Sequence, residues 1–299
     1  MNTGGVSDVA GAGRFAPSPS GDLHVGNLRT ALLAWLWARS TGRSFVLRVE
    51  DLDRVQPGAE SRQLEDLDRL GVDWDGPVVR QSERLDDYAA AVATLSEAGL
   101  TYPCFCTRRE ILDAPTAPHA PPGTYPGTCR NLTDAERAQR ASDRPSALRL
   151  RADTTDWAVT DELHGDFIGV VDDFVLQRND GVPAYNLAVV VDDAAQGVDQ
   201  IVRGDDLLTS APRQAYLASL LGHPAATYAH VPLALNRDGA RLAKRDGAVT
   251  RTELEARGTD VFALIVASLG MTGSSPRDLL PRFDPASLPT EPWVFEPPI

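Results

Sequence analysis

The segment from Arg14 to Asn27, RFAPSPSGDLHVGN, combines features that suit the binding of an anion. Residues 13–16 predict a short strand, Pro17 to Gly26 predict a turn, and a helix begins directly behind it. The first amides of a helix lack partners within it, and the helix dipole adds positive potential there. His24 can donate a hydrogen bond to a phosphate, and Gly26 lacks the Cβ that would keep a base from the backbone. The segment predicts a nucleotide site, although a His before a helix is more often structural or solvated.

A second segment, Arg241-Leu242-Ala243-Lys244-Arg245, lies in a predicted loop after a predicted strand at 228–235. Lys244 is the only lysine among the 29 basic residues of the chain. A chain that otherwise uses arginine retains lysine where a compact ammonium, rather than a planar guanidinium, is required. Such an ammonium suits the stabilisation of negative charge that develops as pyrophosphate leaves a nucleotide. An ordinary solvated loop with an accidental lysine is the plainer alternative.

Three cysteines, Cys104, Cys106 and Cys129, lie in a proline-rich stretch. An odd number in a chain without an export signal argues against a disulfide framework. Thiolates suit zinc, although Cys-x-Cys is tighter than the usual spacing of structural zinc motifs. A tetrahedral site needs a fourth ligand, and His119 is the first choice on chemical grounds. The alternative is three reduced cysteines without a metal.

An α/β fold must hold these segments together. The first segment continues into a predicted helix with an apolar face and a buried strand, Ser44–Val49, that ends at Glu50. The α/β pattern then resumes near Leu187, after an intervening stretch of different composition. The predicted parts are a flexible N-terminal tail (1–13), the first half of a nucleotide-binding fold (14–99), an insertion with the zinc candidate (100–170), the second half with the lysine loop (171–248) and a helical C-terminal subdomain (249–299).

Composition favours an enzyme with a small-molecule site. Hydrophobic residues make up 42% and charged residues 24%, which is ordinary for a globular chain. No apolar run approaches a membrane span of roughly 18 residues and the start does not resemble a secretory signal, so a cytoplasmic location is expected. The net charge of −13 means that any RNA partner must meet a local basic patch. Neither G-x-G-x-x-G nor a P-loop occurs, which excludes those generic nucleotide sites.

Both chemical segments resemble parts of one family. RFAPSPSGDLHVGN resembles the HIGH-signature region of glutamyl-tRNA synthetases, and RLAKR resembles their KMSKS loop. The segments YNLAVVVDD (185–193) and RGDDLL (203–208) fit the same family. The sequence departs from these signatures at Asn27, where the first has His, and in the lysine loop, where only Lys244 holds the key position.

Two features narrow the resemblance to a shortened branch, the glutamyl-queuosine tRNA(Asp) synthetases. The chain ends about 50 residues past the lysine loop, where full synthetases continue into anticodon-binding domains. The insertion also carries the Cys-x-Cys, Tyr and Cys pattern of that branch. The resemblance implies a class I synthetase Rossmann-type α/β fold with a small zinc-bearing insertion, a mainly helical C-terminal subdomain and no anticodon-binding domain.

The implied reaction has two steps. Glutamate is adenylated with ATP and Mg²⁺ without tRNA, and the glutamyl group then esterifies queuosine at the wobble position of tRNA(Asp). The implied partners are L-glutamate, ATP and tRNA(Asp) carrying queuosine, with one structural Zn²⁺; a monomer without a membrane partner is expected. A glutamate-activating enzyme with another acceptor, and a catalytically silent paralogue that binds tRNA or a partner protein, remain as alternatives.

The resemblance also assigns roles to residues that match the family's motifs. Arg14 and Arg203 would bind the carboxylates of glutamate, and Glu50 would hold its ammonium. Tyr185 would add a hydroxyl contact, although it could equally belong to the core, and Arg203 and Glu50 could pair with neighbours. His24 and Lys244 would be catalytic, with the lysine at the α-phosphate. The full sets are Arg14, Phe15, Ala16, Pro17, Ser18, Glu50, Tyr185 and Arg203 for glutamate; His24, Gly26, Asn27 and Lys244 for ATP; and Cys104, Cys106, Tyr125 and Cys129 for zinc.

Overall fold

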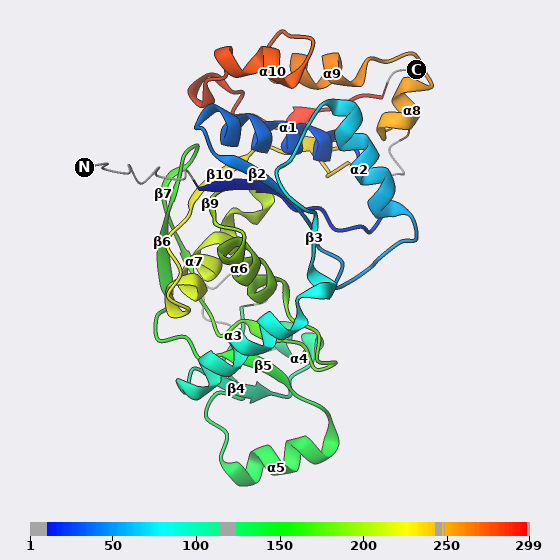
Figure 1. Ribbon diagram of the computed structural model, residues 1–299. Helices are drawn as coiled ribbons and strands as arrows, with labels where there is room; N and C mark the ends of the chain where they lie inside the picture. The colour runs from blue at the N-terminus through cyan, green and yellow to red at the C-terminus, as the bar shows by residue number, and fades with distance from the viewer. Residues whose placement is uncertain (1–10, 114–123, 243–246, 248, 298–299) are drawn as a thin grey trace, which may run out of the picture.

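A seven-stranded sheet organises the molecule (Figure 1). The structure is a computed structural model that describes residues 11–113, 124–242, 247 and 249–297. Most of the predicted N-terminal tail, His119 and Lys244 therefore lie outside the described residues. The strands, in spatial order, are β3 (Val79–Arg80), β2 (Ser44–Val49), β1 (Ala12–Phe15), β9 (Val198–Gly204), β10 (Thr227–Val231), β6 (Asp156–Asp161) and β7 (Gly165–Val170).

All neighbouring strands in this sheet are parallel except β6 and β7, which form an antiparallel pair. The predicted α/β fold is thus confirmed. The chain passes from β1 to β2 on one side, whereas β9 joins β1 on the other side. Such a change of direction opens a crevice at the carboxyl ends of the two central strands.

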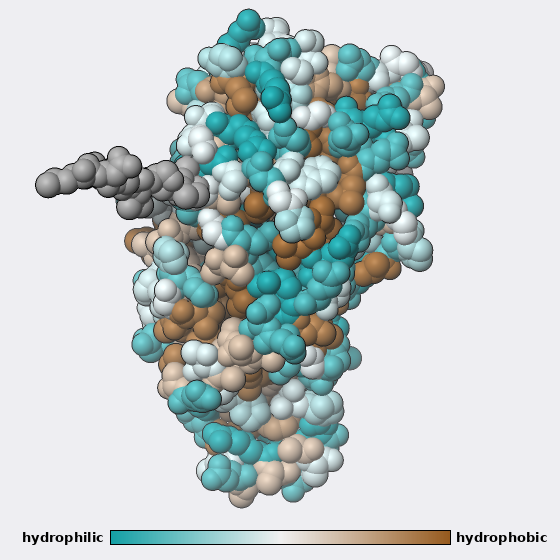
Figure 2. All heavy atoms as spheres, in the orientation of Figure 1, coloured by the Kyte–Doolittle hydropathy of each residue, from teal (hydrophilic) through white to brown (hydrophobic). Residues whose placement is uncertain are grey.

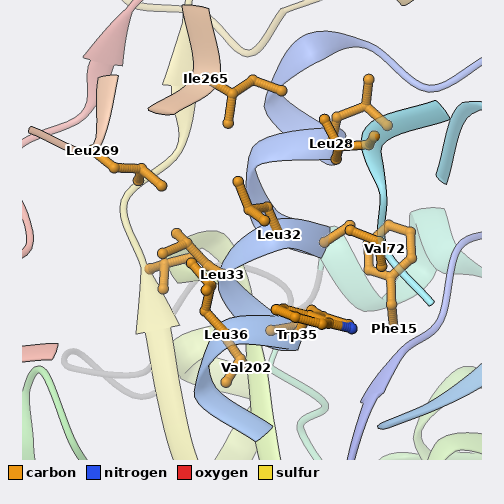
Figure 3. Close-up of a cluster of buried hydrophobic side chains, with 14 of the residues drawn as sticks. Phe15, Leu28, Leu32, Leu33, Trp35, Leu36, Val72, Val202, Ile265 and Leu269 are labelled. Atoms are coloured by element: carbon orange, nitrogen blue, oxygen red, sulfur yellow. The ribbon is translucent and has the colours of Figure 1, made fainter. Parts of the chain in front are cut away.

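One face of the sheet is covered by α1 (Val25–Ser40), which the C-terminal helices cover in turn. Leu32 and Leu33 lie between the sheet residue Val202 and the C-terminal residues Ile265 and Leu269 (Figure 3). The helix is therefore buried on nearly all sides, not only along its predicted apolar face. The other helices at this end of the molecule are α2 (Ala59–Leu70), α8 (Arg251–Glu255), α9 (Val261–Ser268) and α10 (Pro276–Leu279).

The opposite face packs against α6 (Tyr185–Ala195) and α7 (Ala211–Leu220). The apolar run Leu187–Val191 lies within α6 and is buried. Beyond these helices lies a second, antiparallel sheet made of β4 (Thr101–Cys104), β5 (Ala147–Leu150) and β8 (Val175–Gln177). Helices α3 (Leu85–Glu97), α4 (Arg108–Leu112) and α5 (Asp134–Asp143) accompany it.

The stretch 100–170 contributes to both sheets. Its strands β4 and β5 belong to the small sheet, whereas β6 and β7 extend the large one. The predicted division at residue 170 therefore falls between β7 and β8, and the domain limits stay a prediction. A short parallel pair, β11 (Ala234–Leu235) and β12 (Trp293–Val294), ties the C-terminal end to the segment after β10.

The remaining short elements are 3₁₀ turns at Gln81–Glu83, Asp205–Ser210, Leu280–Arg282 and Pro285–Ser287. None of the helices in the described ranges is both long and apolar enough to cross a membrane. On the face drawn in Figure 2, apolar residues form separate patches among hydrophilic ones.

Candidate active site and cysteine cluster

A cleft of about 640 Å³ lies where the carboxyl ends of β1, β2, β9 and β10 meet. It occupies the crevice that the strand order creates. Within the described part of the chain, it brings together every residue assigned above to glutamate or ATP. These residues are Arg14, Phe15, Ala16, Pro17, Ser18, Glu50, Tyr185 and Arg203 for glutamate, and His24, Gly26 and Asn27 for ATP.

His24 caps helix α1 and faces the cleft. Its Nδ1 accepts a hydrogen bond from the Asn27 amide at 3.2 Å, and the Asn27 side chain accepts one from the His24 amide at 3.2 Å. Burial, with a smaller effect of Arg241, lowers the pKa of His24 to about 4. The imidazole is therefore neutral at pH 7, and because Nδ1 is an acceptor, the proton sits on Nε2. His24 can thus donate one hydrogen bond into the cleft.

Gly26 lies where α1 approaches the segment after β10. A Cβ on Gly26 would come within 2.7 Å of the Ala234 Cβ, so this position requires glycine for packing. The sequence alone suggests another reason for glycine here, namely that it lets a nucleotide base approach the helix backbone. The start of the helix lines the cleft at His24, Gly26 and Asn27.

Both described ends of the lysine loop lie beside His24. Arg241 lines the cleft, and its guanidinium pairs with Asp206 at 2.5 Å. After the loop in the sequence, the Val249 carbonyl accepts a hydrogen bond from the Val25 amide at 2.8 Å, and Thr250 forms a β-bridge with His24. The described residues at both ends of the second segment are therefore adjacent to the first segment in the fold.

Arg203 is a buried cation at the end of β9, only 5% exposed. Its Nε donates to His230 Nε2 at 3.0 Å, its Nη1 to Gln214 Oε1 at 2.7 Å, and its Nη2 to the Leu207 carbonyl at 3.4 Å. All three acceptors are uncharged. In the described ranges, no carboxylate lies within ion-pair distance of Arg203. A buried charge without a counter-ion is costly, so Arg203 is set up to receive an anion.

Arg14 is also 5% exposed and lies in the neighbouring strand β1. Its Nη1 donates to the Val202 carbonyl at 2.9 Å, and its Nε lies 3.6 Å from Asp193 Oδ1 without a hydrogen-bond partner. Burial, reinforced by the charge of Arg203, lowers the pKa of Arg14, although Asp193 opposes that shift. Two guanidinium groups therefore face the same side of the cleft. The alternative of a core role for Tyr185 fails, because that side chain is 43% exposed at the cleft.

Glu50 belongs to a buried charge network that sequence reasoning missed. Arg48, fully buried in strand β2 two residues before Glu50, approaches Asp193 at 2.8 Å and both Glu50 and Asp192 at 3.6 Å. Burial opposes the charge on Arg48, but these three carboxylates outweigh it and raise its pKa. Burial raises the pKa of Glu50, while the charges of Arg48 and Arg14 limit the rise. The only signals in the sequence are an arginine within an apolar strand and the acidic pair that ends the apolar run of α6.

Asp192 connects this network to the helix that leads into the small sheet. Its carboxylate accepts hydrogen bonds from Tyr88 at 2.8 Å, Gln81 at 2.8 Å and Arg84 at 2.7 Å. Each oxygen of this fully buried side chain thus has a donor. The network therefore holds Glu50 in place at the wall of the cleft.

Comparison with known proteins agrees with this geometry. Residues 12–285 match the family model of the catalytic domain of class I tRNA synthetases for E and Q. A Glutamyl-Q tRNA(Asp) synthetase from Nocardia farcinica is 67% identical over 291 residues, which cover 96% of this chain and 94% of that protein. A protein of the same name from Cutibacterium acnes is 58% identical over 268 residues, covering 87% of this chain and 76% of the other.

The chain belongs to the glutamyl-Q tRNA(Asp) synthetase family. It is accordingly an ATP-dependent ligase of the class I aminoacyl-tRNA synthetase type. Among solved structures, a glutamate-tRNA synthetase from Elizabethkingia anophelis has a TM-score of 0.80 at 28% identity, covering 96% of this chain and 68% of that one. A glutamate tRNA ligase from Elizabethkingia meningosepticum, solved in complex with its amino acid, gives 0.79 at 26% identity, covering 97% and 68%.

The three cysteines of this glutamyl-Q tRNA(Asp) synthetase family member form one cluster. The Sγ atoms of Cys104, Cys106 and Cys129 all lie within 4.8 Å of one another, and no disulfide links them. The Sγ atoms of Cys106 and Cys129 are 3.6 Å apart. Two thiolates on a tetrahedral zinc would be about 3.8 Å apart, given Zn–S bonds of about 2.3 Å. The spacing therefore fits a zinc site.

Tyr125 lies against the three cysteines. Its hydroxyl lies 3.4 Å from Cys104 Sγ and 3.9 Å from Cys106 Sγ, and it accepts a hydrogen bond from the Cys129 amide at 2.7 Å. The guanidinium of Arg149 stacks 3.7 Å above the Tyr125 ring. Three thiols and one phenol thus lie close together, and four such donors match the number of ligands in a tetrahedral zinc site.

Proposed function

We propose that this protein activates L-glutamate with ATP and Mg²⁺, without tRNA, and then transfers the glutamyl group to the queuosine base at the wobble position of tRNA(Asp). The observation that carries the proposal is one cleft that contains two buried guanidinium groups, one carboxylate that is 12% exposed and the N-terminus of α1. The acceptor, queuosine in tRNA(Asp), is inferred from the names of the relatives.

The charges of the cleft match the charges of glutamate. A substrate with two carboxylates and one ammonium needs two cationic groups and one anionic group. Arg203 and Arg14 offer the cations, and Glu50 offers the anion. Guanidinium binds carboxylate with paired hydrogen bonds, which adds geometric selectivity to the attraction. We infer that Arg203, which has no carboxylate partner in the described chain, supplies the stronger of the two contacts.

Adenylation then requires charge stabilisation at the phosphates. A glutamate carboxylate oxygen attacks the α-phosphorus of ATP, the bond to the β-phosphate oxygen breaks, and pyrophosphate leaves. The Gly26 amide at the start of α1 and the Nε2–H of His24 donate to phosphate oxygens, because the Val25 and Asn27 amides already donate to Val249 and His24, and the ammonium of Lys244 offsets the developing charge. Mg²⁺ accompanies ATP. In the second step, a hydroxyl of queuosine attacks the glutamyl carbonyl and AMP leaves.

The cysteine cluster would hold one structural zinc ion through Cys104, Cys106, Cys129 and Tyr125. Bound zinc would join the end of β4 to the turn before α5. Such an ion contributes to folding and takes no part in the reaction. The small sheet and its zinc would then form a rigid body beside the cleft.

Glutamate-dependent exchange of pyrophosphate into ATP, measured without tRNA, tests the first step. We expect exchange with glutamate and none with glutamine, which lacks the second carboxylate. A chain without any exchange would be a silent paralogue that only binds tRNA or another protein. Charging of tRNA(Asp) with and without queuosine tests the second step. Equal charging of both would mean that the glutamyl group goes to another acceptor.

A further inference from the structure

A buried chain of hydrogen bonds runs from Asp161 through His230 to Arg203. Asp161 Oδ2 lies 2.6 Å from His230 Nδ1, and Arg203 Nε donates to His230 Nε2 at 3.0 Å. Asp161 is 2% exposed and His230 is fully buried. Since His230 Nε2 accepts from Arg203, its proton sits on Nδ1 and points to Asp161. The imidazole is therefore held in one tautomer.

His230 is a neutral ring between two charges. Burial lowers its pKa, and the charge of Arg203 lowers it further, although Asp161 opposes the shift. Tyr228, two residues earlier on β10, stacks against the imidazole with a centroid distance of 5.7 Å and an interplanar angle of 11°. The same tyrosine ring lies 5.5 Å from the Arg203 guanidinium carbon. Tyr228, on β10, thus contacts both the His230 imidazole and the Arg203 guanidinium.

We propose that His230, oriented by Asp161, is a positioning residue that holds Arg203 through an uncharged acceptor and leaves its positive charge for a substrate carboxylate. A carboxylate in direct contact with Arg203 would orient it equally well, but it would neutralise the guanidinium and compete with the substrate. Because the imidazole lies between them, the Asp161 carboxylate is separated from the Arg203 guanidinium by the width of the ring. This inference rests on the proposed function, because it takes glutamate as the anion.

Gln214, on α7, is a second uncharged acceptor for the Arg203 guanidinium. Its Oε1 accepts from Arg203 Nη1 at 2.7 Å, and its Nε2 donates to Asn186 at 3.0 Å. Gln214 is 2% exposed. Two buried, uncharged acceptors therefore orient the guanidinium from β10 and α7, and neither offsets its charge.

A purely structural role for His230 is the competing explanation. The Asp161 carboxylate also accepts from the amides of Leu163 and His164, at 2.9 and 3.0 Å, and the His164 ring contacts the His230 carbonyl at 3.0 Å. These bonds tie β10 to the β6–β7 turn. The two roles use different nitrogens of the His230 ring, so they can be separated by substitution.

The matched variants are His230→Gln and His230→Asn. The Gln oxygen can reach the position of Nε2 and accept from Arg203, whereas the Asn amide can reach the position of Nδ1 and donate to Asp161 only. We expect His230→Asn to raise the KM for glutamate by about 10–100-fold, the effect of losing a hydrogen bond to a charged group, with the KM for ATP unchanged. His230→Gln should stay within about fivefold of the parent protein. Equal glutamate KM values in the two variants, with equal losses of Tm, would establish the structural role alone.

Gln214→Glu tests the charge directly if a His230 variant fails to fold. The new carboxylate has nearly the same shape and would pair with Arg203, so the KM for glutamate should rise about tenfold or more without loss of Tm. An unchanged glutamate KM in this variant would overturn the proposal. The parent protein serves as the reference in each exchange assay. Its failure to exchange pyrophosphate with glutamate would instead overturn the proposed function, and the inference about Arg203 with it.

Discussion

The reaction cleft and the cysteine cluster are built in different ways. The cleft draws residues from Arg14 to Arg241, and the topology of the parallel sheet brings their segments together. The cluster draws its donors from Cys104 to Cys129, within one local stretch. The cleft holds buried charges that neighbouring protein groups orient, whereas the cluster gathers four donors that suit one metal ion. A change in the cleft should therefore affect rate or substrate binding, and a change in the cluster should affect metal content and local stability.

The largest expected effect is on the cleft side of this comparison. Lys244→Ala should slow glutamate adenylation by about 10²–10³-fold, the usual loss for one charge-stabilising donor. Pyrophosphate exchange at saturating glutamate and ATP measures it. Arg237→Ala is the matched control, since this exposed residue precedes the same loop and pairs only with Glu296 in the described chain. Equal exchange rates in Lys244→Ala and the parent protein would refute the role of the lysine.

The next effect concerns the cluster. Tyr125→Phe removes the proposed fourth donor and should weaken zinc binding by at least roughly 10–100-fold, since the loss of a group that only supports a zinc ligand already costs that much. His119→Ala is the comparison variant and should bind zinc like the parent protein. Metal analysis combined with a chelator titration measures both.

The same variants test whether the two regions are independent. Tyr125→Phe should leave glutamate-dependent exchange within about threefold, because Tyr125 is not among the residues that line the cleft. Zinc loss in His119→Ala but not in Tyr125→Phe would assign the fourth ligand to His119. A collapse of exchange on zinc removal would show that the cleft depends on the cluster.

Much of the cleft could be predicted because its key residues lie in short, continuous motifs. His24 and Asn27 follow a strand and a turn that the local pattern defines, and Arg203 lies near the end of strand β9. The parallel sheet then brings strand ends together regardless of their separation along the chain. Local motifs and sheet topology explain why these residues meet, whereas the roles assigned to them came from the family resemblance.

The buried polar partners could not be predicted in the same way. Arg48 and Asp192 come from a strand and a helix whose pairing depends on the tertiary packing, and hydrophobic periodicity carries no information about it. The pairing of β6 with β10, which brings Asp161 to His230, was missed for the same reason. The all-round burial of α1 had a signal in Leu33 and Trp37, but it also required the C-terminal helices.

A smaller effect should appear in the pH dependence of stability. The pKa of His24 is about 4 in the folded protein, because burial disfavours its charged form, whereas an unfolded His has a pKa near 6.5. As the pH falls below about 6.5, the unfolded chain binds a proton that the folded chain does not bind until about pH 4. The free energy of unfolding therefore falls in this window. From pH 7 to 5 the loss due to His24 should be about 1–2 kcal/mol.

His24→Asn removes this titration and keeps a residue that caps helices well. Urea unfolding of the variant and the parent protein at pH 7 and pH 5 measures the difference. His230, whose pKa is also lowered by burial, is present in both proteins, so its contribution cancels. The same loss of stability in both proteins would show that His24 titrates normally.

The smallest effect is expected from an exposed ion pair beside the cysteine cluster. Arg144 pairs with Glu110 at 3.0 Å, and both side chains are about half exposed. Water and salt screen such a pair, so Arg144→Ala should change the free energy of unfolding by less than about 1 kcal/mol. Urea unfolding with zinc present measures it. A loss of several kcal/mol would mean that surface charges, rather than the four donors and the zinc proposed for them, stabilise this region. The contrast with the buried charges of the cleft would then fail.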